Sequence, residues 1–155
     1  MYWTDWGANP KIEKAGMDGS RRRSIVTRNL VWPNGLTVDQ AANLLFWADA
    51  KLDTIEMSDL DGGSRKAIMS SAADIHPFGL ALYRNVLYWT DWGKKSISSL
   101  NLTSRNQQVV VTGLQKPMDI RVFDSSLESG KKWLLSLSFI KEAISLSAWF
   151  SLVAF

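Results

Sequence analysis

Three aspartates, Asp5, Asp49 and Asp91, each close a short aromatic segment and are the most regular candidates for chemistry in this chain. A metal site or an acid–base pair would need further ligands or a partner group beside each carboxylate. One acidic residue per repeat is instead typical of a structural role. His76 is the single histidine and there is no cysteine, so no catalytic triad, thiolate chemistry or His-rich metal site can be assembled. We expect no catalytic residue, no metal and no cofactor.

The aspartates belong to a segment that repeats. The hexapeptide YWTDWG occurs at residues 2–7 and again at residues 88–93, and residues 46–49 carry the looser copy FWAD. The copies begin at residues 2, 46 and 88, so the repeat is 44 and then 42 residues long. Segments led by Pro33, Pro77 and Pro117 keep the same register. A repeat of this length is typical of solenoids and propellers.

Each repeat predicts four short β-strands. The first follows the proline and alternates apolar residues, as at Leu36 and Val38. The aromatic segment forms the second, with Leu45 and Trp47 on one face. An Asp-Gly-Ser turn joins the third strand to the fourth. We expect the third strands at residues 12–17, 54–60 and 96–102 and the fourth strands at residues 24–27, 67–69 and 109–112. Four antiparallel strands make one propeller blade, so the sequence predicts an all-β fold with about three blades.

The repeats end near Asp124, and residues 125–155 form a second, unrelated segment. Residues 133–155 are mostly apolar, with polar residues at helical spacing on one face, which favours an amphipathic helix packed on exposed blade surface. A membrane span of this length is possible, but the central Lys141-Glu142 pair makes it costly. We therefore expect an apolar tail, helical or disordered, that does not insert into a membrane.

The charge pattern argues against nucleic acid as a partner. The chain has 18 Lys and Arg against 15 Asp and Glu, and the basic residues are scattered over turns without forming one stripe. The absence of cysteine and of a signal peptide would by itself suggest an intracellular protein. Because the chain begins inside a repeat, we expect any signal to lie upstream instead.

These motifs resemble the YWTD propellers of the low-density lipoprotein receptor family, over Met1 to about Asp124. The resemblance rests on residues 32–37 (WPNGLT), 47–52 (WADAKL), 76–80 (HPFGL) and the YWTDWG copies. It implies a six-bladed ring in the extracellular region of a membrane receptor, with the aspartates bracing loops and an innermost strand at residues 118–123 closing the ring onto the first blade. Only half a ring is present, and the tail replaces the usual cysteine-rich module. We expect a truncated fragment, whose half rings could associate as a two-fold dimer.

The resemblance implies a binding module that takes a protein ligand or peptide loop and reaches the membrane only through its parent receptor. A nidogen-like basement-membrane scaffold module and a non-functional truncated product are the alternatives. A propeller hydrolase is disfavoured, because the innermost strands place Thr37, Ala81 and Arg121 between their apolar residues, and these offer no metal-ligand set.

In the resembling Wnt co-receptor propellers, peptide loops bind the face that carries the loops after each second strand and before each first strand. The matching positions here are Trp32, Asn34, His76 and Trp92. Exposed Trp side chains are common binding hot spots, and an Asn amide suits an extended peptide. Alternatively, Trp32 and Trp92 pack between blades, Asn34 serves the turn before Gly35, and His76 is structural as the residue before a proline.

One modification site is predicted. Asn101-Leu102-Thr103 is an N-glycosylation sequon at the end of a predicted third strand. Such matches are frequent by chance, so the sequon alone identifies Asn101 as a candidate only.

Overall fold

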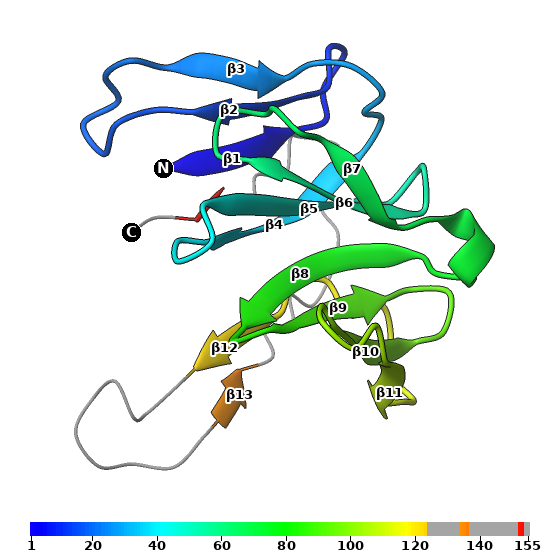
Figure 1. Cartoon of the computed structure of the whole chain (residues 1–155). Coiled ribbons are helices and arrows are strands. Elements are labelled where there is room, and N and C mark those ends of the chain that lie inside the picture. The colour runs from blue at the N-terminus through cyan, green and yellow to red at the C-terminus, as the bar shows by residue number, and fades with distance from the viewer. Residues whose placement is uncertain (124–133, 137–151, 154–155) are drawn as a thin grey trace.

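The computed structural model describes residues 1–123, 134–136 and 152–153, which form three four-stranded antiparallel sheets and one two-stranded sheet (Figure 1). The first sheet contains β1 (Tyr2–Asp5), β2 (Lys11–Lys14), β3 (Arg23–Val26) and β14 (Leu152–Val153). The second contains β4 (Pro33–Asp39), β5 (Leu44–Asp49), β6 (Thr54–Asp59) and β7 (Lys66–Met69). The third contains β8 (Pro77–Tyr83), β9 (Val86–Asp91), β10 (Ser96–Asn101) and β11 (Gln107–Val111), and the small sheet pairs β12 (Arg121–Phe123) with β13 (Leu134–Ser136). One short 3-10 helix, η1 (Ser71–Ala73), precedes β8.

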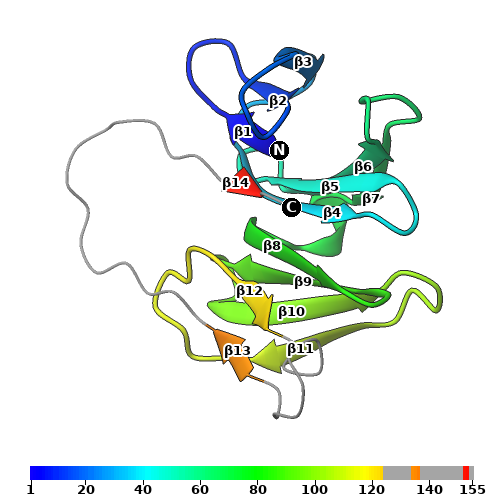
Figure 2. The same ribbon diagram turned by 90° about the vertical axis from the view of Figure 1, so that its left-hand side faces the viewer.

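The sheets are arranged as propeller blades. The innermost strands β4, β8 and β12 lie next to one another, and β3, β7 and β11 lie at the outer edges (Figure 2). The predicted all-β propeller with four antiparallel strands per blade is therefore confirmed.

The aromatic strands are apolar at successive positions because both of their faces are buried. In β5, Leu45 and Trp47 pack with Ile12 of the first sheet, whereas Phe46 packs on the other side with Leu80 and Trp89 of the third. Each of the three β5 side chains is at most 1% exposed. Burial of such a side chain contributes roughly 1.5–3 kcal/mol, so this strand holds the second sheet between its neighbours.

Two glycines let the innermost strands approach closely. A Cβ atom on Gly35 would lie 2.5 Å from the Leu80 backbone nitrogen, and one on Gly79 would lie 2.7 Å from the Met118 carbonyl oxygen. Only glycine allows this distance between backbones. Pro33 and Pro77 begin β4 and β8, as predicted, in the strand-start position that a proline tolerates.

Some boundaries differ from the sequence prediction. The strand expected at residues 118–123 begins only at Arg121, and β2 ends at Lys14, where the chain turns toward β3. In the tail, Leu134–Ser136 and Leu152–Val153 are extended rather than helical. The rest of the expected helix lies outside the described residues.

The ring closure that the resemblance implies is not made among the strands that the structure describes. The inner edge of β1 pairs with β14, and β12 pairs with β13, so β12 does not meet the first sheet. β1 and β12 lie at opposite ends of the row of sheets in Figure 2, which explains why they do not pair. Within the described residues, no helix has the length and apolar character needed to cross a membrane.

Candidate functional site

Antiparallel strands place alternate turns at opposite ends of each sheet, and one end carries the candidate ligand-binding residues. The loops of this end lie on the right in Figure 1. We call it the loop face and define it by residues 6–10, 27–32, 50–53, 70–76 and 92–95.

Buried Asp49 holds two loops of this face together. Its carboxylate accepts hydrogen bonds from the backbone N–H groups of Val31 (2.8 Å) and Trp32 (3.1 Å) in one loop. It also accepts bonds from the N–H groups of Lys51 (3.0 Å) and Leu52 (3.1 Å) in the other. Because these bonds fix the backbone, Val31, Trp32 and Leu52 remain 36–43% exposed in a defined arrangement.

The other two aspartates act similarly. Asp91 is fully buried and accepts hydrogen bonds from the N–H groups of His76 (3.2 Å) and Lys94 (2.9 Å), which lie in different loops. Asp5 accepts a bond from the Gly7 N–H at 2.9 Å. The aspartates therefore brace loops. In the described part of the chain, no group of three or more His, Asp or Glu side chains is placed to hold a metal ion.

The exposed part of the loop face centres on Trp32. The ring centroid of Trp32 lies 6.2 Å from that of Trp6, and the planes are tilted by 59°. The Lys51 ammonium lies 5.5 Å from the Trp32 centroid, within the range of a cation–π interaction. The three side chains form a surface that offers apolar contact and one positive charge.

His76 and Trp92 lie beside this group and make specific contacts. His76 Nδ1 is 2.6 Å from an Asp53 carboxylate oxygen, and its ring centroid is 6.1 Å from that of Trp92. Trp92 stacks on Phe78 with centroids 4.5 Å apart and an angle of 5°. Its indole N–H donates to the Pro117 carbonyl oxygen at 2.8 Å. Trp92 is thus anchored in the packing toward the next blade.

The structure brings Trp32, His76 and Trp92 to one face but places Asn34 inside. Asn34 lies in β4 with 8% of its surface exposed, and its carbonyl oxygen accepts a hydrogen bond from the Thr4 hydroxyl at 2.9 Å. Only a small part of Asn34 can meet a ligand from this position.

The sequence analysis missed Val31 and Leu52 as members of the site. Both are large apolar residues in loops that Asp49 binds, and their exposure would have been hard to infer from composition alone. Asn101, the candidate glycosylation residue, ends β10, where its side-chain oxygen accepts bonds from the Thr103 and Ser104 N–H groups. Its modification stays a prediction.

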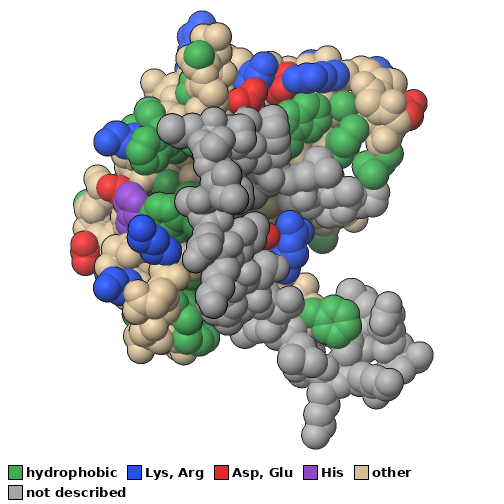
Figure 3. Space-filling view, turned by 180° about the vertical axis from the view of Figure 1, so that it is seen from behind, with side chains coloured by type: hydrophobic (Ala, Val, Ile, Leu, Met, Phe, Trp, Pro, Cys, Tyr) green, Lys and Arg blue, Asp and Glu red, His purple; other side chains and the backbone are tan. Residues whose placement is uncertain are grey.

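Charged side chains of both signs are spread over the side of the molecule seen in Figure 3. On the side seen in Figure 3, Lys and Arg side chains stand in separate groups, with acidic, apolar and polar side chains between them. This distribution differs from the continuous basic stripe that is typical of nucleic-acid-binding surfaces.

Residues 1–40 and 43–84, more than half of the chain, match the family described as low-density lipoprotein receptor repeat class B. The chain belongs to this family. Among curated relatives, vitellogenin receptor Yl of Drosophila melanogaster is 44% identical over 97 residues, which cover 63% of this chain and 5% of the relative. The vitellogenin receptor of Solenopsis invicta is 35% identical over 129 residues, which cover 83% of this chain and 7% of the relative. The class B repeats described here thus correspond to a small part of these receptors.

Solved structures have the same fold. A chain of a nidogen/laminin complex is 38% identical and superposes with a TM-score of 0.62, covering 69% of this chain and 40% of that one. A luciferin-regenerating enzyme superposes with a TM-score of 0.59 over 76% of this chain and 45% of the enzyme. At 13% identity, the second likeness shows the propeller fold alone and carries no argument about chemistry.

Proposed function

We propose that this chain is a protein-ligand-binding module from the extracellular region of a vitellogenin receptor-type membrane receptor, and that it is not an enzyme. The observation that carries the proposal is the exposed apolar group of Val31, Trp32 and Leu52, fixed in place by buried Asp49. A Trp held in one orientation can bury a large area at small entropic cost, which is the property of a binding hot spot.

The chemistry of the loop face suits a peptide segment of a protein ligand. Trp6 and Trp32 offer a tilted aromatic surface, Lys51 supplies a positive charge over it, and the Asp53–His76 pair borders it. An apolar side chain of the ligand would contact the Trp rings, and an acidic or polar one would reach Lys51. Asn34 and Trp92 contribute less in this proposal, because one is buried and the other is bound to Pro117.

A binding experiment with the immobilised chain tests the proposal, with vitellogenin of Solenopsis invicta as the probe. Trp32→Ala should weaken binding roughly tenfold or more, which corresponds to about 1–3 kcal/mol, while the unfolding midpoint stays close to that of the parent chain. Met17→Ala is the matched control, because Met17 is 60% exposed in a turn at the opposite end of the sheet. Equal affinities of the parent, Trp32→Ala and Met17→Ala chains would reject the loop face as the binding surface.

A second candidate is a nidogen-like scaffold module, which the 38% identity with a chain of the nidogen/laminin complex favours. A laminin fragment serves as the probe in a parallel arm. Binding of laminin that depends on Trp32, with no binding of vitellogenin, would select this second function.

A further inference from the structure

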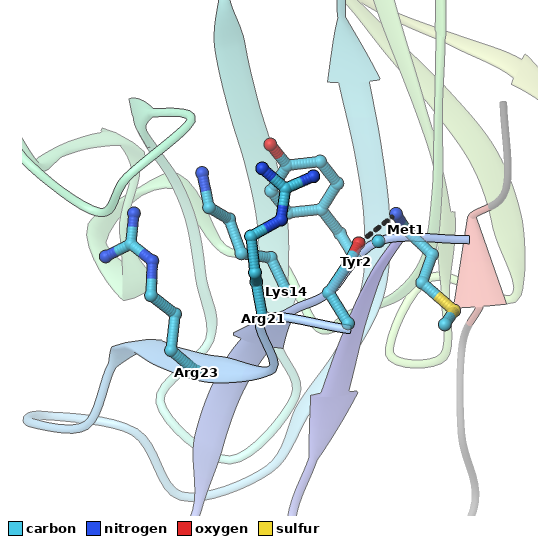
Figure 4. Close-up of a pocket in the computed structure, with 7 residues that line it drawn as sticks. Met1, Tyr2, Lys14, Arg21 and Arg23 are labelled. Carbon is cyan, nitrogen blue, oxygen red and sulfur yellow. Dashed lines mark hydrogen bonds between the residues drawn. The ribbon is translucent and has the colours of Figure 1, made fainter. Parts of the chain in front are cut away.

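A basic pocket lies at the end of the first sheet opposite to the loop face. Its lining consists of Met1, Tyr2, Lys14, Ala15, Gly16, Arg21 and Arg23, and its volume is about 400 Å³ (Figure 4). The turn between β2 and β3 and the adjoining ends of these strands carry five of these residues, and this turn is at the other end of the sheet from the turn at residues 6–10. The three cationic side chains, Lys14, Arg21 and Arg23, line one hollow.

The cationic side chains of the pocket outnumber the acidic side chains that contact them in the described structure. Lys14 and Arg23 both bind the same carboxylate oxygen of Asp61, and Lys14 also donates to the Leu60 carbonyl oxygen at 3.3 Å. The hydrogen bond from Lys14 lowers the pKa of Asp61 below its usual value. The exposed Arg21 guanidinium has no acidic partner among the described residues, so the pocket keeps a surplus of positive charge.

The other blades show that the fold does not require these cations. Lys14 lies directly opposite Arg23 in the sheet, and the same pair of positions holds Met57 and Lys66 in the second sheet and Ser99 and Gln108 in the third. Like charges directly opposite each other destabilise a sheet. Asp61 of the neighbouring sheet offsets this repulsion between Lys14 and Arg23, whereas Arg21 adds a third cation without an acidic partner among the described residues, and this excess charge points to a role in binding.

The backbone at Arg21 is left-handed, as it is at several other Arg and Lys residues of this chain, and it sets the direction in which the side chain leaves the turn. Arg21 has φ 53°, in the left-handed region, and Ser64 has φ 52° at the corresponding position of the second sheet. The turn therefore needs a left-handed residue, for which Asn or Gly would be less strained. A long cation at this position lines the pocket with Lys14 and Arg23 (Figure 4).

We propose that the basic pocket is a second binding site, which takes an acidic side chain of a protein partner through Arg21, Lys14 and Arg23. The site is independent of the loop face. The pocket already binds a carboxylate, that of Asp61, through two of its cations. Tyr2 and Met1 supply an apolar wall for the stem of a Glu or Asp side chain.

A polyanion such as a sulfated saccharide fits the surroundings less well. The neighbouring Arg22 is neutralised by Glu13 at 2.7 Å, and the acids Asp18 and Asp61 adjoin the same turns. Charges of both signs around one small basic hollow match a single carboxylate better than a row of sulfates.

The test uses the full chain and, as the probe, a fluorescein-labelled peptide with one Glu between Gly residues, with parallel arms for a heparin hexasaccharide and inorganic phosphate. Arg21→Asn removes the charge and suits the left-handed backbone, so it should weaken peptide binding roughly tenfold, the loss expected for one charge-assisted hydrogen bond. Arg21→Lys should recover part of that loss. Lys66→Asn is the control, since it removes one positive charge from a residue that does not line the pocket.

Unfolding curves of all variants establish that they remain folded. Saturable peptide binding that falls with Arg21→Asn but not with Lys66→Asn supports the proposal. Equal losses in the two variants would mean attraction by net charge alone and would overturn it. Arg21-dependent binding of the heparin hexasaccharide or phosphate without binding of the peptide, or no saturable binding of any probe, would overturn it as well.

Discussion

The second and third sheets share strand order, register and a bulge in the outermost pair, yet they attach to their preceding neighbours differently. In the second sheet, Arg65 makes two hydrogen bonds to Glu56, at 2.7 and 2.8 Å, and its guanidinium lies 5.2 Å from the Trp47 ring. The same guanidinium donates to the carbonyl oxygens of Arg28 and Asn29 in the preceding connection.

The third sheet has Trp89, Ser98 and Gln107 at the corresponding positions and therefore lacks this ion pair. Like the junction between the first two sheets, its contact with the second sheet includes an apolar cluster, here with Phe46, Leu80 and Trp89. The polar contacts are different ones: Arg105 donates to the Ile68 carbonyl oxygen, the Leu82 N–H donates to the Thr37 hydroxyl, and His76 contacts Asp53. The comparison shows that the buried aromatic strand and its aspartate define a blade, whereas the links between blades differ from one junction to the next.

The largest effect should come from the glycines of β4 and β8, each of which packs against the innermost segment of the following repeat. Gly35→Ala places a Cβ against the backbone of Phe78, Gly79 and Leu80, and Gly79→Ala places one against Met118, Asp119 and Ile120. Since backbone cannot give way as a flexible side chain can, we expect each variant to lose about 3 kcal/mol or more of unfolding free energy in urea titrations followed by Trp fluorescence.

Gly93→Ala is the matched control for both glycine variants, because its nearest contacts would lie at 3.4 Å, an ordinary van der Waals distance. Its unfolding free energy should stay within about 0.5 kcal/mol of the parent value. A loss at Gly93 as large as that at Gly79 would contradict the close approach of the innermost strands.

The sequence could predict the blades because their cause is local and periodic. The continuous apolar run in β5 follows from burial on two faces, and the prolines that begin β4 and β8 mark strand starts. The site could be predicted only in part. The burial of Asn34 and the bond from Trp92 to Pro117 depend on partners distant in the sequence, which no spacing reveals.

The basic pocket was beyond sequence reasoning for the same reason. Lys14, Arg21 and Arg23 appear as scattered turn residues in the sequence, and only the pairing of β2 with β3 brings them around one hollow. The pairing of β1 with β14 could not be predicted either, because it depends on an unpaired strand edge and not on a sequence pattern.

The polar contacts that Arg65 makes between the first and second sheets can be removed by one substitution. Arg65→Met leaves Glu56, which is 9% exposed, without its partner and also removes the bonds to Arg28 and Asn29. We expect a loss of about 2–3 kcal/mol, near the lower end for a broken buried pair because the Arg65 side chain is 21% exposed. Gln107→Met in the third sheet should change stability by less than about 0.5 kcal/mol. Similar losses in the two variants would remove the distinction between the junctions.

A second difference between the sheets is the residue before the aspartate, Thr90 in the third and Ala48 in the second. The Thr90 hydroxyl accepts a hydrogen bond from the Gly79 N–H at 2.7 Å and donates to the Met118 carbonyl oxygen at 3.4 Å. Thr90→Val keeps the shape but leaves the buried Gly79 N–H unpaired, so we expect a loss of about 1–2 kcal/mol. Thr112→Val, at an exposed residue just after β11, is the control for the substitution itself and should have little effect on the unfolding midpoint.

The smallest predicted loss of stability concerns the first sheet. This sheet has the same kind of Glu–Arg pair as the second sheet, but its Arg side chain is more exposed. Arg22 binds Glu13 at 3.2 and 2.7 Å, and its side chain is 60% exposed, against 21% for Arg65. The hydrogen bond from Arg22 lowers the pKa of Glu13 below its ordinary value of 4.5, although burial acts in the opposite direction. The ionised Glu13 therefore stabilises the folded state fully above pH 4.5, and this contribution is lost as the pH falls through the lowered pKa.

Arg22→Gln should bring the pKa of Glu13 closer to its ordinary value, so the free energy of unfolding should depend less on pH below 4.5 than in the parent chain. Above pH 4.5, we expect the variant to be less stable by under about 1 kcal/mol, because solvent screens an exposed guanidinium. Arg28→Gln is the control, since it removes the same charge from an exposed residue that does not contact Glu13 in the described structure. Urea titrations between pH 3 and 7 measure the difference. If the difference in unfolding free energy between the parent chain and Arg22→Gln were constant across that range, the hydrogen bond to Glu13 would not contribute to the pH dependence of stability. The Glu–Arg pair would then stabilise the protein only where a neighbouring sheet covers it, as it does at Glu56 and Arg65.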